Sequence, residues 1–261
     1  MKSILRMLLC FLMVSCAEKS PGLGRDSFLS IEIGAGMLAV QAQTGILPAG
    51  YAFFDLEGIR NSSLVALLEN YGGTLNAAGC MRDILENAKN VQMVFDDREF
   101  IVFSRQNAEK KEFSGVVRVD GTDIYTLPNC GEIGGKWKKQ EDGSYVGSFG
   151  RFAVNTWKWS FPQRKDGLIL AGADDRMEMQ ITVHLENGFH GNAFFVFRSA
   201  NLAQGIEKQV SMFRKQLASH RKLKGLAEKI RVRRENERFA LHVSWSRHDV
   251  RQLLQALGRR R

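Results

Sequence analysis

Residues 181–197 read ITVHLENGFHGNAFFVF, with apolar side chains at alternating positions on either side of Asn187-Gly188. Alternation with a period of two is typical of a strand with one buried face, and Asn-Gly favours a tight turn between two strands. Residues 230–246 (IRVRRENERFALHVSWS) show the same pattern around a polar turn. Both stretches therefore predict antiparallel hairpins, which largely decide the class of fold.

A further hairpin is predicted earlier in the chain, in residues 91–105 (VQMVFDDREFIVFSR). A turn centred on Asp97-Arg98 pairs Phe95 with Phe100 on one face. Shorter strands are predicted at residues 51–55, 115–120, 135–139, 145–149 and 152–159. Apolar residues at helical spacing predict a helix that is capped by Asn61 or Ser62 and ends at Gly72-Gly73. Further helices are predicted over residues 75–89, 201–224 and 248–257.

The composition is that of a folded globular chain: 261 residues, 44% hydrophobic, 25% charged, with 25 Gly and 4 Pro. It excludes a disordered chain and a fibrous protein. Because hairpins alternate with amphipathic helices, we expect an α+β fold with a mostly antiparallel sheet and helices packed on it. We expect the globular region to cover residues 47–258, either as one unit or as two degenerate α/β modules, 47–165 and 166–258. Residues 259–261 form a basic tail.

The N-terminal segment, MKSILRMLLCFLMVSC, places Lys2 and Arg6 before a short apolar run. This order is typical of a secretory signal peptide, and the run is too short to span a membrane as a helix. Its last four residues, Met13-Val14-Ser15-Cys16, resemble the lipobox of bacterial lipoprotein precursors, with Met13 where Leu is preferred. The resemblance implies a signal peptide of residues 1–15, a lipid on Cys16 and a tether up to residue 46. The alternative is a plain signal peptide that is cleaved a few residues later.

The same resemblance implies a location. Ala17 rather than Asp follows the Cys, which in Gram-negative lipoproteins favours the outer membrane, here on its periplasmic side. Export leads to an oxidising compartment, where Cys80 and Cys130 can form a disulfide. In the alternative, Cys80 packs against a helix as a small apolar residue.

Residues 47–69 (LPAGYAFFDLEGIRNSSLVALLE) loosely resemble the start of modules in uncharacterised bacterial envelope proteins. In those modules a strand that ends in Asp-Leu leads into a helix through a turn of the Arg-x-Ser-x-Leu kind. The resemblance implies no activity and places a fold boundary near Leu47. The matching residues here are Asp55, Leu56, Arg60, Ser62 and Leu64.

No catalytic motif stands out. Residues 34–39 (GAGMLA) fit the G-x-G-x-x-A fingerprint of dinucleotide-binding turns, but hairpins follow where that fold needs parallel strands, so we expect a flexible or edge-strand segment. The nucleophile motif G-x-S-x-G is absent. The carboxylate pairs Asp96-Asp97 and Asp174-Asp175 fall at predicted turns, where Asp is common for structural reasons.

His184 and His190 are close in sequence and form a candidate pair of metal ligands. With a two-residue turn at Asn187-Gly188, His190 lies opposite Leu185, so the two imidazoles are predicted to project from opposite faces. We therefore expect neither a metal site nor a cofactor.

Charge is unevenly distributed along the chain. Residues 208–261 hold 16 of the 37 Lys and Arg residues but only 4 of the 28 Asp and Glu residues, so the net charge of +9 resides in this region. A basic region of this kind attracts anionic lipid, lipopolysaccharide, an acidic wall polymer or an acidic protein. Nucleic acid is not expected, because no recognition motif is present. The candidate anion-binding residues are Arg214, Lys215, Arg221, Lys222, Lys224, Arg231 and Arg233.

These observations predict a non-catalytic lipoprotein of the bacterial cell envelope, attached to the membrane through Cys16. Binding or scaffolding is expected to use the basic C-terminal region. One alternative is an envelope hydrolase without a known motif. Another is a carrier of a hydrophobic ligand, which would use aromatic residues such as Trp157, Trp159 and Phe161.

Overall fold

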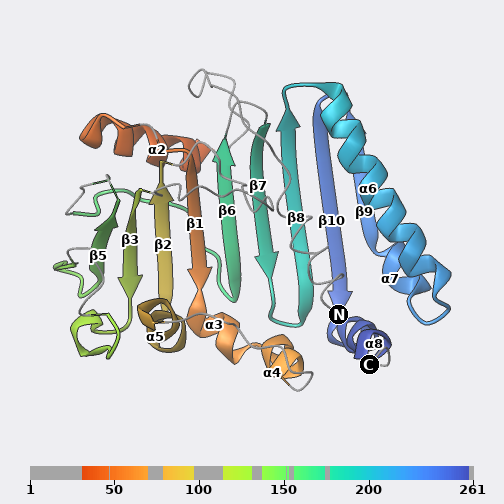
Figure 1. Cartoon of the computed structure of the whole chain (residues 1–261), viewed down its shortest axis with the longest axis horizontal. Helices are drawn as coiled ribbons and strands as arrows, with labels where there is room; N and C mark the ends of the chain where they lie inside the picture. The colour runs from red at the N-terminus through yellow and green to blue at the C-terminus, as the bar shows by residue number, and fades with distance from the viewer. Residues whose placement is uncertain are drawn as a thin grey trace.

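The structure is a computed structural model that describes residues 31–46, 48–69, 79–96, 114–130, 137–150, 152, 156–173 and 177–258. Within these residues one antiparallel sheet of ten strands runs in the order β4-β5-β3-β2-β1-β6-β7-β8-β10-β9 (Figure 1). With helices packed on it, the sheet confirms the predicted α+β class. The strands are β1 (Gly50–Asp55), β2 (Asn90–Phe95), β3 (Gly115–Asp120), β4 (Lys138–Lys139), β5 (Tyr145–Phe149), β6 (Gly167–Ala173), β7 (Met177–His184), β8 (Gly188–Phe197), β9 (Ile230–Glu235) and β10 (Arg238–Ser246).

The chain fills this sheet from the centre outwards. β1 pairs with β6 from Gly50 opposite Gly172 to Phe54 opposite Leu168. From the centre outwards, the order on one side is β1, β2, β3, β5, β4, and on the other side it is β6, β7, β8, β10, β9. In each half the fourth strand along the chain therefore lies at the edge of the sheet, and the fifth strand lies next to it on the inside. The segments 47–165 and 166–258 thus contribute five strands each to one continuous sheet.

Successive side chains of a strand project to opposite faces of the sheet. We call the two faces the α6 face and the α2 face, after the helices that cover them. The α6 face is buried beneath helices at both ends, whereas α2 and residues 156–164 pack on the α2 face over β5, β3, β2, β1 and β6. The helices are α2 (Ile31–Thr44), α3 (Leu56–Asn61), α4 (Ser63–Glu69), α5 (Gly79–Asn87), the short 3-10 helix η1 (Ile124–Thr126), α6 (Ala200–Ser219), α7 (Lys224–Glu228) and α8 (Arg247–Gly258).

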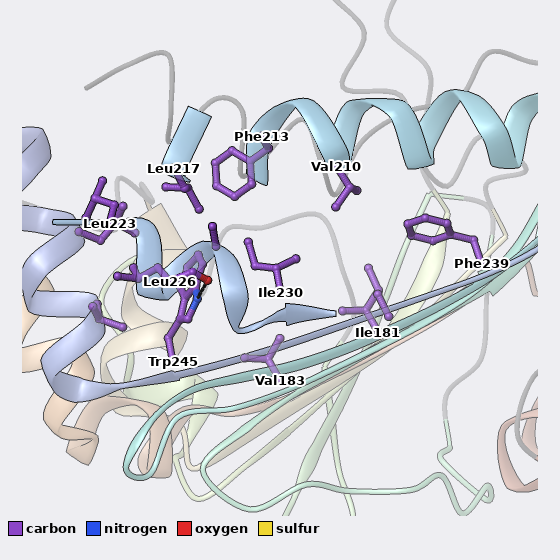
Figure 2. Close-up of a cluster of buried hydrophobic side chains, with 14 of the residues drawn as sticks. Ile181, Val183, Val210, Phe213, Leu217, Leu223, Leu226, Ile230, Phe239 and Trp245 are labelled. Atoms are coloured by element: carbon purple, nitrogen blue, oxygen red, sulfur yellow. Dashed lines mark hydrogen bonds between the residues drawn. The ribbon is translucent and has the colours of Figure 1, made fainter. Parts of the chain in front are cut away.

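The core beneath α6 holds the C-terminal half together. Val210, Phe213 and Leu217 of α6 point toward Ile181 and Val183 of β7 (Figure 2). The helix predicted over residues 201–224 has an apolar stripe in its sequence, and the stripe is confirmed as buried at these three positions. The predicted stripe consists of Leu202, Ile206, Val210, Phe213 and Leu217. At its start, however, Leu202 is 41% exposed, and Ala203 is the residue buried there.

The predicted tether, residues 16–46, is wrong in its C-terminal part, because residues 31–44 form α2. Ile33, Met37 and Val40 of this helix are completely buried, so the fold begins well before the predicted boundary at Leu47. Gly36 explains the error. The ring of Phe161 packs so closely on α2 that a Cβ at Gly36 would lie 2.5 Å from it, and glycine weakens the helical signal.

Two strand predictions are also corrected. Both edges of β2 are occupied, because Met93 pairs with Ala52 of β1 and with Val117 of β3. The predicted pairing of residues 91–95 with residues 100–105 is therefore wrong, and residues 97–113 lie outside the described residues. Residues 156–164, placed partly in a predicted strand, pair with no described strand. Strand β6, at the centre of the sheet, was not predicted.

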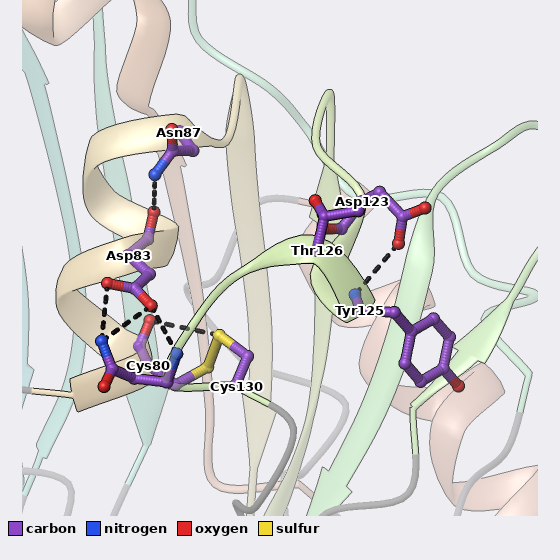
Figure 3. The surroundings of a disulfide bond; sticks show 8 residues. Cys80, Asp83, Asn87, Asp123, Tyr125, Thr126 and Cys130 are labelled. Carbon is purple, nitrogen blue, oxygen red and sulfur yellow. Dashed lines mark hydrogen bonds between the residues drawn. A yellow bond between two sulfur atoms is a disulfide. The ribbon is translucent and has the colours of Figure 1, made fainter.

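A disulfide joins the N-terminal turn of α5 to the loop after η1 (Figure 3). Cys80 and Cys130 are bonded, and both are buried. The carboxylate of Asp83 accepts a hydrogen bond of 2.9 Å from the backbone N–H of Asn129. The bond and this hydrogen bond together hold α5 over the part of the α6 face that β2 and β3 form.

Replacement of Phe213 by Ala should lower the free energy of unfolding by about 3 kcal/mol or more, because it leaves a cavity between α6 and the sheet. The adjacent Met212 is 56% exposed, so Met212→Ala is the matched control and should change stability by less than about 0.5 kcal/mol. Urea denaturation followed by circular dichroism measures both. Equal losses in the two variants would contradict this packing.

Loss of the disulfide should lower the free energy of unfolding by about 2–4 kcal/mol, since the bond closes a long loop in the unfolded chain. The two cysteines are 50 residues apart. The double variant Cys80→Ser/Cys130→Ser and the reduced wild type should show the same lowered urea midpoint. A reductant that shifts the wild type but not the double variant provides the control.

Candidate anion-binding surface

Six of the thirteen Lys and Arg residues described in the C-terminal region, 208–258, lie on α6, on the turn that follows it or at the start of α7. Helix α6 begins after Ser199, whose hydroxyl accepts a hydrogen bond from the N–H of Leu202 (3.4 Å). From Lys208 to Lys224 the chain contains six Lys or Arg residues and no Asp or Glu. Because the apolar stripe of α6 is buried, its charged side chains are exposed to solvent.

The turn between α6 and α7 is anchored from inside. The N–H of Leu223 donates to the carbonyl of His220 (2.7 Å), and the side chains of Leu223 and Leu226 are buried in the core of Figure 2. The exposed residues around these anchors therefore stay at the C-terminal end of α6, where the helix dipole favours positive charge. We call five exposed cations the basic surface: Arg214, Lys215, Arg221, Lys222 and Lys224.

Arg231 and Arg233 do not belong to this surface, and the prediction of one set of seven is corrected here. On β9 these two residues alternate with Ile230 and Val232, which contact the core beneath α6. Arg231 and Arg233 therefore project from the α2 face, where Arg231 lies opposite His242 of β10. The sheet itself separates the seven residues into a group of five and a group of two.

Three other cations of the region form ion pairs. Lys229 Nζ lies 2.5 Å from Asp249, Arg234 Nε lies 2.7 Å from Glu207, and Arg233 lies 2.5 Å from Glu235. Among the described residues, no ion pair involves a member of the basic surface. Within the described residues, the charge of the basic surface is therefore not compensated by ion pairs.

Two further side chains extend the basic surface along α6. Lys208, Met212 and Lys215 are spaced by four and three residues, which places them on one side of the helix, and all three are exposed. Met212 thus presents an apolar side chain between two cations. The spacing can be seen in the sequence, but only the structure shows that this side of α6 faces solvent and not the sheet.

Asp249 fixes the start of α8, and its carboxylate offsets the positive charge of Lys229. Its carboxylate accepts hydrogen bonds from Lys229 Nζ and from the N–H and hydroxyl of Ser246, both at 2.7 Å. The Ser246 hydroxyl in turn accepts from the N–H of Asp249 (3.2 Å), which completes a capping box. Burial opposes ionisation, but the hydrogen bonds from Lys229 and Ser246 hold the pKa of Asp249 below its ordinary value.

The histidine prediction is wrong in register. His184 lies directly opposite His190, so both imidazoles project from the α2 face, with ring centroids 6.5 Å apart. The Nδ1 atoms are engaged elsewhere, His184 with the carbonyl of Lys165 (3.2 Å) and His190 with the hydroxyl of Ser244 (3.0 Å). In the part of the chain that the structure describes, no three His, Cys, Asp or Glu side chains gather as metal ligands.

Several features noted in the sequence lie outside the residues that the structure describes. They are the signal peptide, Cys16, Asp97, Asp174-Asp175 and the tail 259–261. The glycines of the fingerprint at residues 34–39 lie inside α2 rather than at a turn between a strand and a helix. No helix in the described ranges has the length and the apolar character that crossing a membrane requires.

Comparison with known proteins yields little. No protein-family model matches the chain, and no curated protein matches it. Among solved structures, the treponemal protein TP0453 in its crystal form I is similar at 13% identity, over 85% of this chain and 96% of TP0453. Its TM-score of 0.39 is too low to carry an argument about fold or function.

Replacement of Asp249 by Asn should lower the free energy of unfolding by about 1–3 kcal/mol at pH 7, since Lys229 and Ser246 lose a charged acceptor. The pKa of Asp249 is lower in the folded state than the unfolded value of about 3.9. Its stabilising contribution is therefore complete above that value and disappears as the pH falls through the folded-state pKa. Denaturation of wild type and variant at pH 7, 5 and 3 should show the difference shrinking at low pH.

The matched control is Glu235→Gln, which removes the exposed partner of Arg233. An exposed ion pair contributes little, so this variant should differ from wild type by less than about 0.5 kcal/mol at pH 7. A difference for Asp249→Asn that is constant with pH would contradict the assigned role of the carboxylate.

Proposed function

We propose that this protein is a non-catalytic, lipid-anchored protein of the bacterial cell envelope that binds an anionic membrane surface through the basic surface of α6 and α7. In this proposal the lipid is attached at Cys16, and the protein lies on the periplasmic side of the outer membrane. The observation that carries the proposal is the run from Lys208 to Lys224. It contains six cations and no carboxylate, on a helix whose apolar side is already buried.

The basic surface is suited to lipid headgroups on electrostatic grounds. Each Lys or Arg held near an anionic bilayer contributes about 1 kcal/mol to binding. A basic cluster together with an acyl chain forms a two-part membrane attachment, in which the lipid keeps the surface at high local concentration. Among the described residues the five cations have no ion-pair partner to give up on binding.

Met212 favours a membrane over a polar wall polymer. This residue is 56% exposed and lies on the same side of α6 as Lys208 and Lys215. An apolar side chain between two cations can enter the boundary between headgroups and acyl chains while the cations remain at the phosphates. A purely polar polymer offers no environment in which Met212 would become buried.

The test is sedimentation of the mature chain, carrying Cys16→Ala to prevent acylation, with vesicles of phosphatidylglycerol and phosphatidylcholine or of phosphatidylcholine alone. We expect binding to the anionic vesicles only, weakening as salt rises from 50 to 300 mM. The variant Arg214→Gln/Lys215→Gln/Arg221→Gln/Lys222→Gln/Lys224→Gln should bind at least about 100-fold more weakly.

A charge-matched control removes five exposed cations elsewhere: Lys138, Lys139, Arg231, Arg233 and Arg238, each changed to Gln. This control has the same net charge as the first variant and should retain at least half of the wild-type affinity. Equal losses of affinity in the two variants would show that net charge, and not the basic surface, determines binding. Failure of the wild type to bind the anionic vesicles would refute the proposal. Thermal unfolding of both variants checks that each is folded.

A further inference from the structure

A hollow of about 350 Å³ opens on the α2 face, away from the basic surface. Its floor includes Gln92 of β2 and Arg118 of β3, and its walls come from the segment 157–163 that crosses the sheet. Sites for small ligands generally measure about 300–1,000 Å³. The hollow thus has the size of a small-molecule site. Its lining residues are Gln92, Arg118, Trp157, Lys158, Trp159, Ser160, Phe161 and Gln163.

The walls are aromatic and are held in place by the core. Trp157, Trp159 and Phe161 are buried, while Lys158 and Ser160 between them are exposed. The Trp157 and Trp159 rings meet edge to face, with centroids 4.8 Å apart. This alternation produced the incorrect strand prediction, because the segment buries one side against the face of the sheet instead of pairing at an edge.

Tyr51 fixes the segment to the sheet. Its ring stacks on Phe161 with centroids 4.2 Å apart, and its hydroxyl donates to the carbonyl of Pro162 (2.9 Å). Tyr51 is fully buried, and burial raises the pKa of its hydroxyl, which therefore stays protonated and able to donate. On the other side of Phe161, Gly36 lets α2 approach the ring. The walls of the hollow are thus largely pre-formed.

One polar group at the hollow lacks a partner. Trp159 is 6% exposed, and its indole N–H has no hydrogen-bond acceptor among the described residues. A buried donor without an acceptor costs about 1–3 kcal/mol, which a ligand oxygen would recover. Gln92, also buried, lines the same hollow, and its side-chain oxygen lies 3.4 Å from the Tyr51 hydroxyl oxygen.

The hollow also carries positive charge. Arg118 and Lys158 line it, and none of its lining residues is acidic. Arg118 pairs with Asp142, whose pKa is lowered to about 2 by hydrogen bonds from Ser144 and Arg118. That ion pair fixes the guanidinium and offsets its charge, so the net positive charge at the hollow comes from Lys158, which has no ion-pair partner among the described residues.

We infer that the hollow binds a small amphipathic anion, with an apolar body against the aromatic walls and an oxyanion near Trp159, Arg118 and Lys158. The inference is independent of the proposed membrane surface, which lies on the other face of the sheet and in the other half of the chain. The ligand class is defined by its chemistry: a flat or aliphatic apolar part and one carboxylate, sulfonate or phosphate group.

Two dyes with the same ring system test this inference on the mature chain carrying Cys16→Ala. 1-Anilinonaphthalene-8-sulfonate carries the anionic group, and N-phenyl-1-naphthylamine lacks it. We expect one saturable site for the sulfonate dye, with quenching of tryptophan fluorescence and at least 10-fold tighter binding than the neutral dye. Equal affinity for the two dyes, or no saturable site, would overturn the inference.

Two matched pairs of variants locate the site. Trp159→Phe keeps an aromatic ring and removes the N–H. It should therefore lower the affinity for the sulfonate dye three- to tenfold and leave the affinity for the neutral dye unchanged. Trp137→Phe is the control, because the Trp137 N–H is also buried without an acceptor but packs with the core on the α6 face. Equal effects of the two substitutions on the sulfonate dye would place it outside the hollow.

The contribution of charge is tested with the double variant Arg118→Gln/Lys158→Gln, which should bind the sulfonate dye at least 10-fold more weakly than the wild type. The five-Gln variant of the basic surface should bind this dye as the wild type does. If the five-Gln variant loses dye binding instead, the dye reports on α6 and the inference fails. The vesicle experiment is unaffected by that outcome, so failure of the hollow and failure of the membrane surface can be told apart.

Discussion

The antiparallel pairing of β1 with β6 is the contact on which the rest of the molecule depends, because it joins the two five-strand halves into one sheet. Without it, each half would expose the backbone groups of a long edge strand. The pairing also aligns the side chains of the two halves. Tyr51 lies beside Ala171 on the α2 face, and Ala52 lies beside Leu170 on the α6 face. The same outward order of strands in both halves is the pattern that a duplicated five-strand unit would leave.

The two faces of this sheet have different chemistry. The α6 face is apolar along its length and is buried under helices, with the basic surface outermost. The α2 face is mostly apolar over β5, β3, β2, β1 and β6, where α2 and the aromatic segment cover it, but it carries Gln180, Asn192 and His242 on β7, β8 and β10. The two proposed binding sites therefore occupy different layers and are expected to act independently.

The candidate site could be predicted in part, and the limit has a definite physical origin. Five of the seven predicted cations lie on α6 or beside α7 and form the basic surface. Arg231 and Arg233 were grouped with them because all seven are close in sequence. Strand alternation separates Arg231 from Ile230, and Ile230 packs beneath α6, so the two arginines must face away from that helix.

The sequence by itself determined the α+β class, the hairpins of β7 with β8 and of β9 with β10, and the amphipathic side of α6. These features follow from local periodicity and turn residues, which act over a few neighbouring positions. Only the tertiary structure decided the register that brings His184 opposite His190, since a shift of one residue moves a strand's side chains to the other face. It also decided that residues 31–44 are a helix and that residues 156–164 cross the sheet. Both depend on Phe161 packing against Gly36 and Tyr51, contacts between segments far apart in the chain.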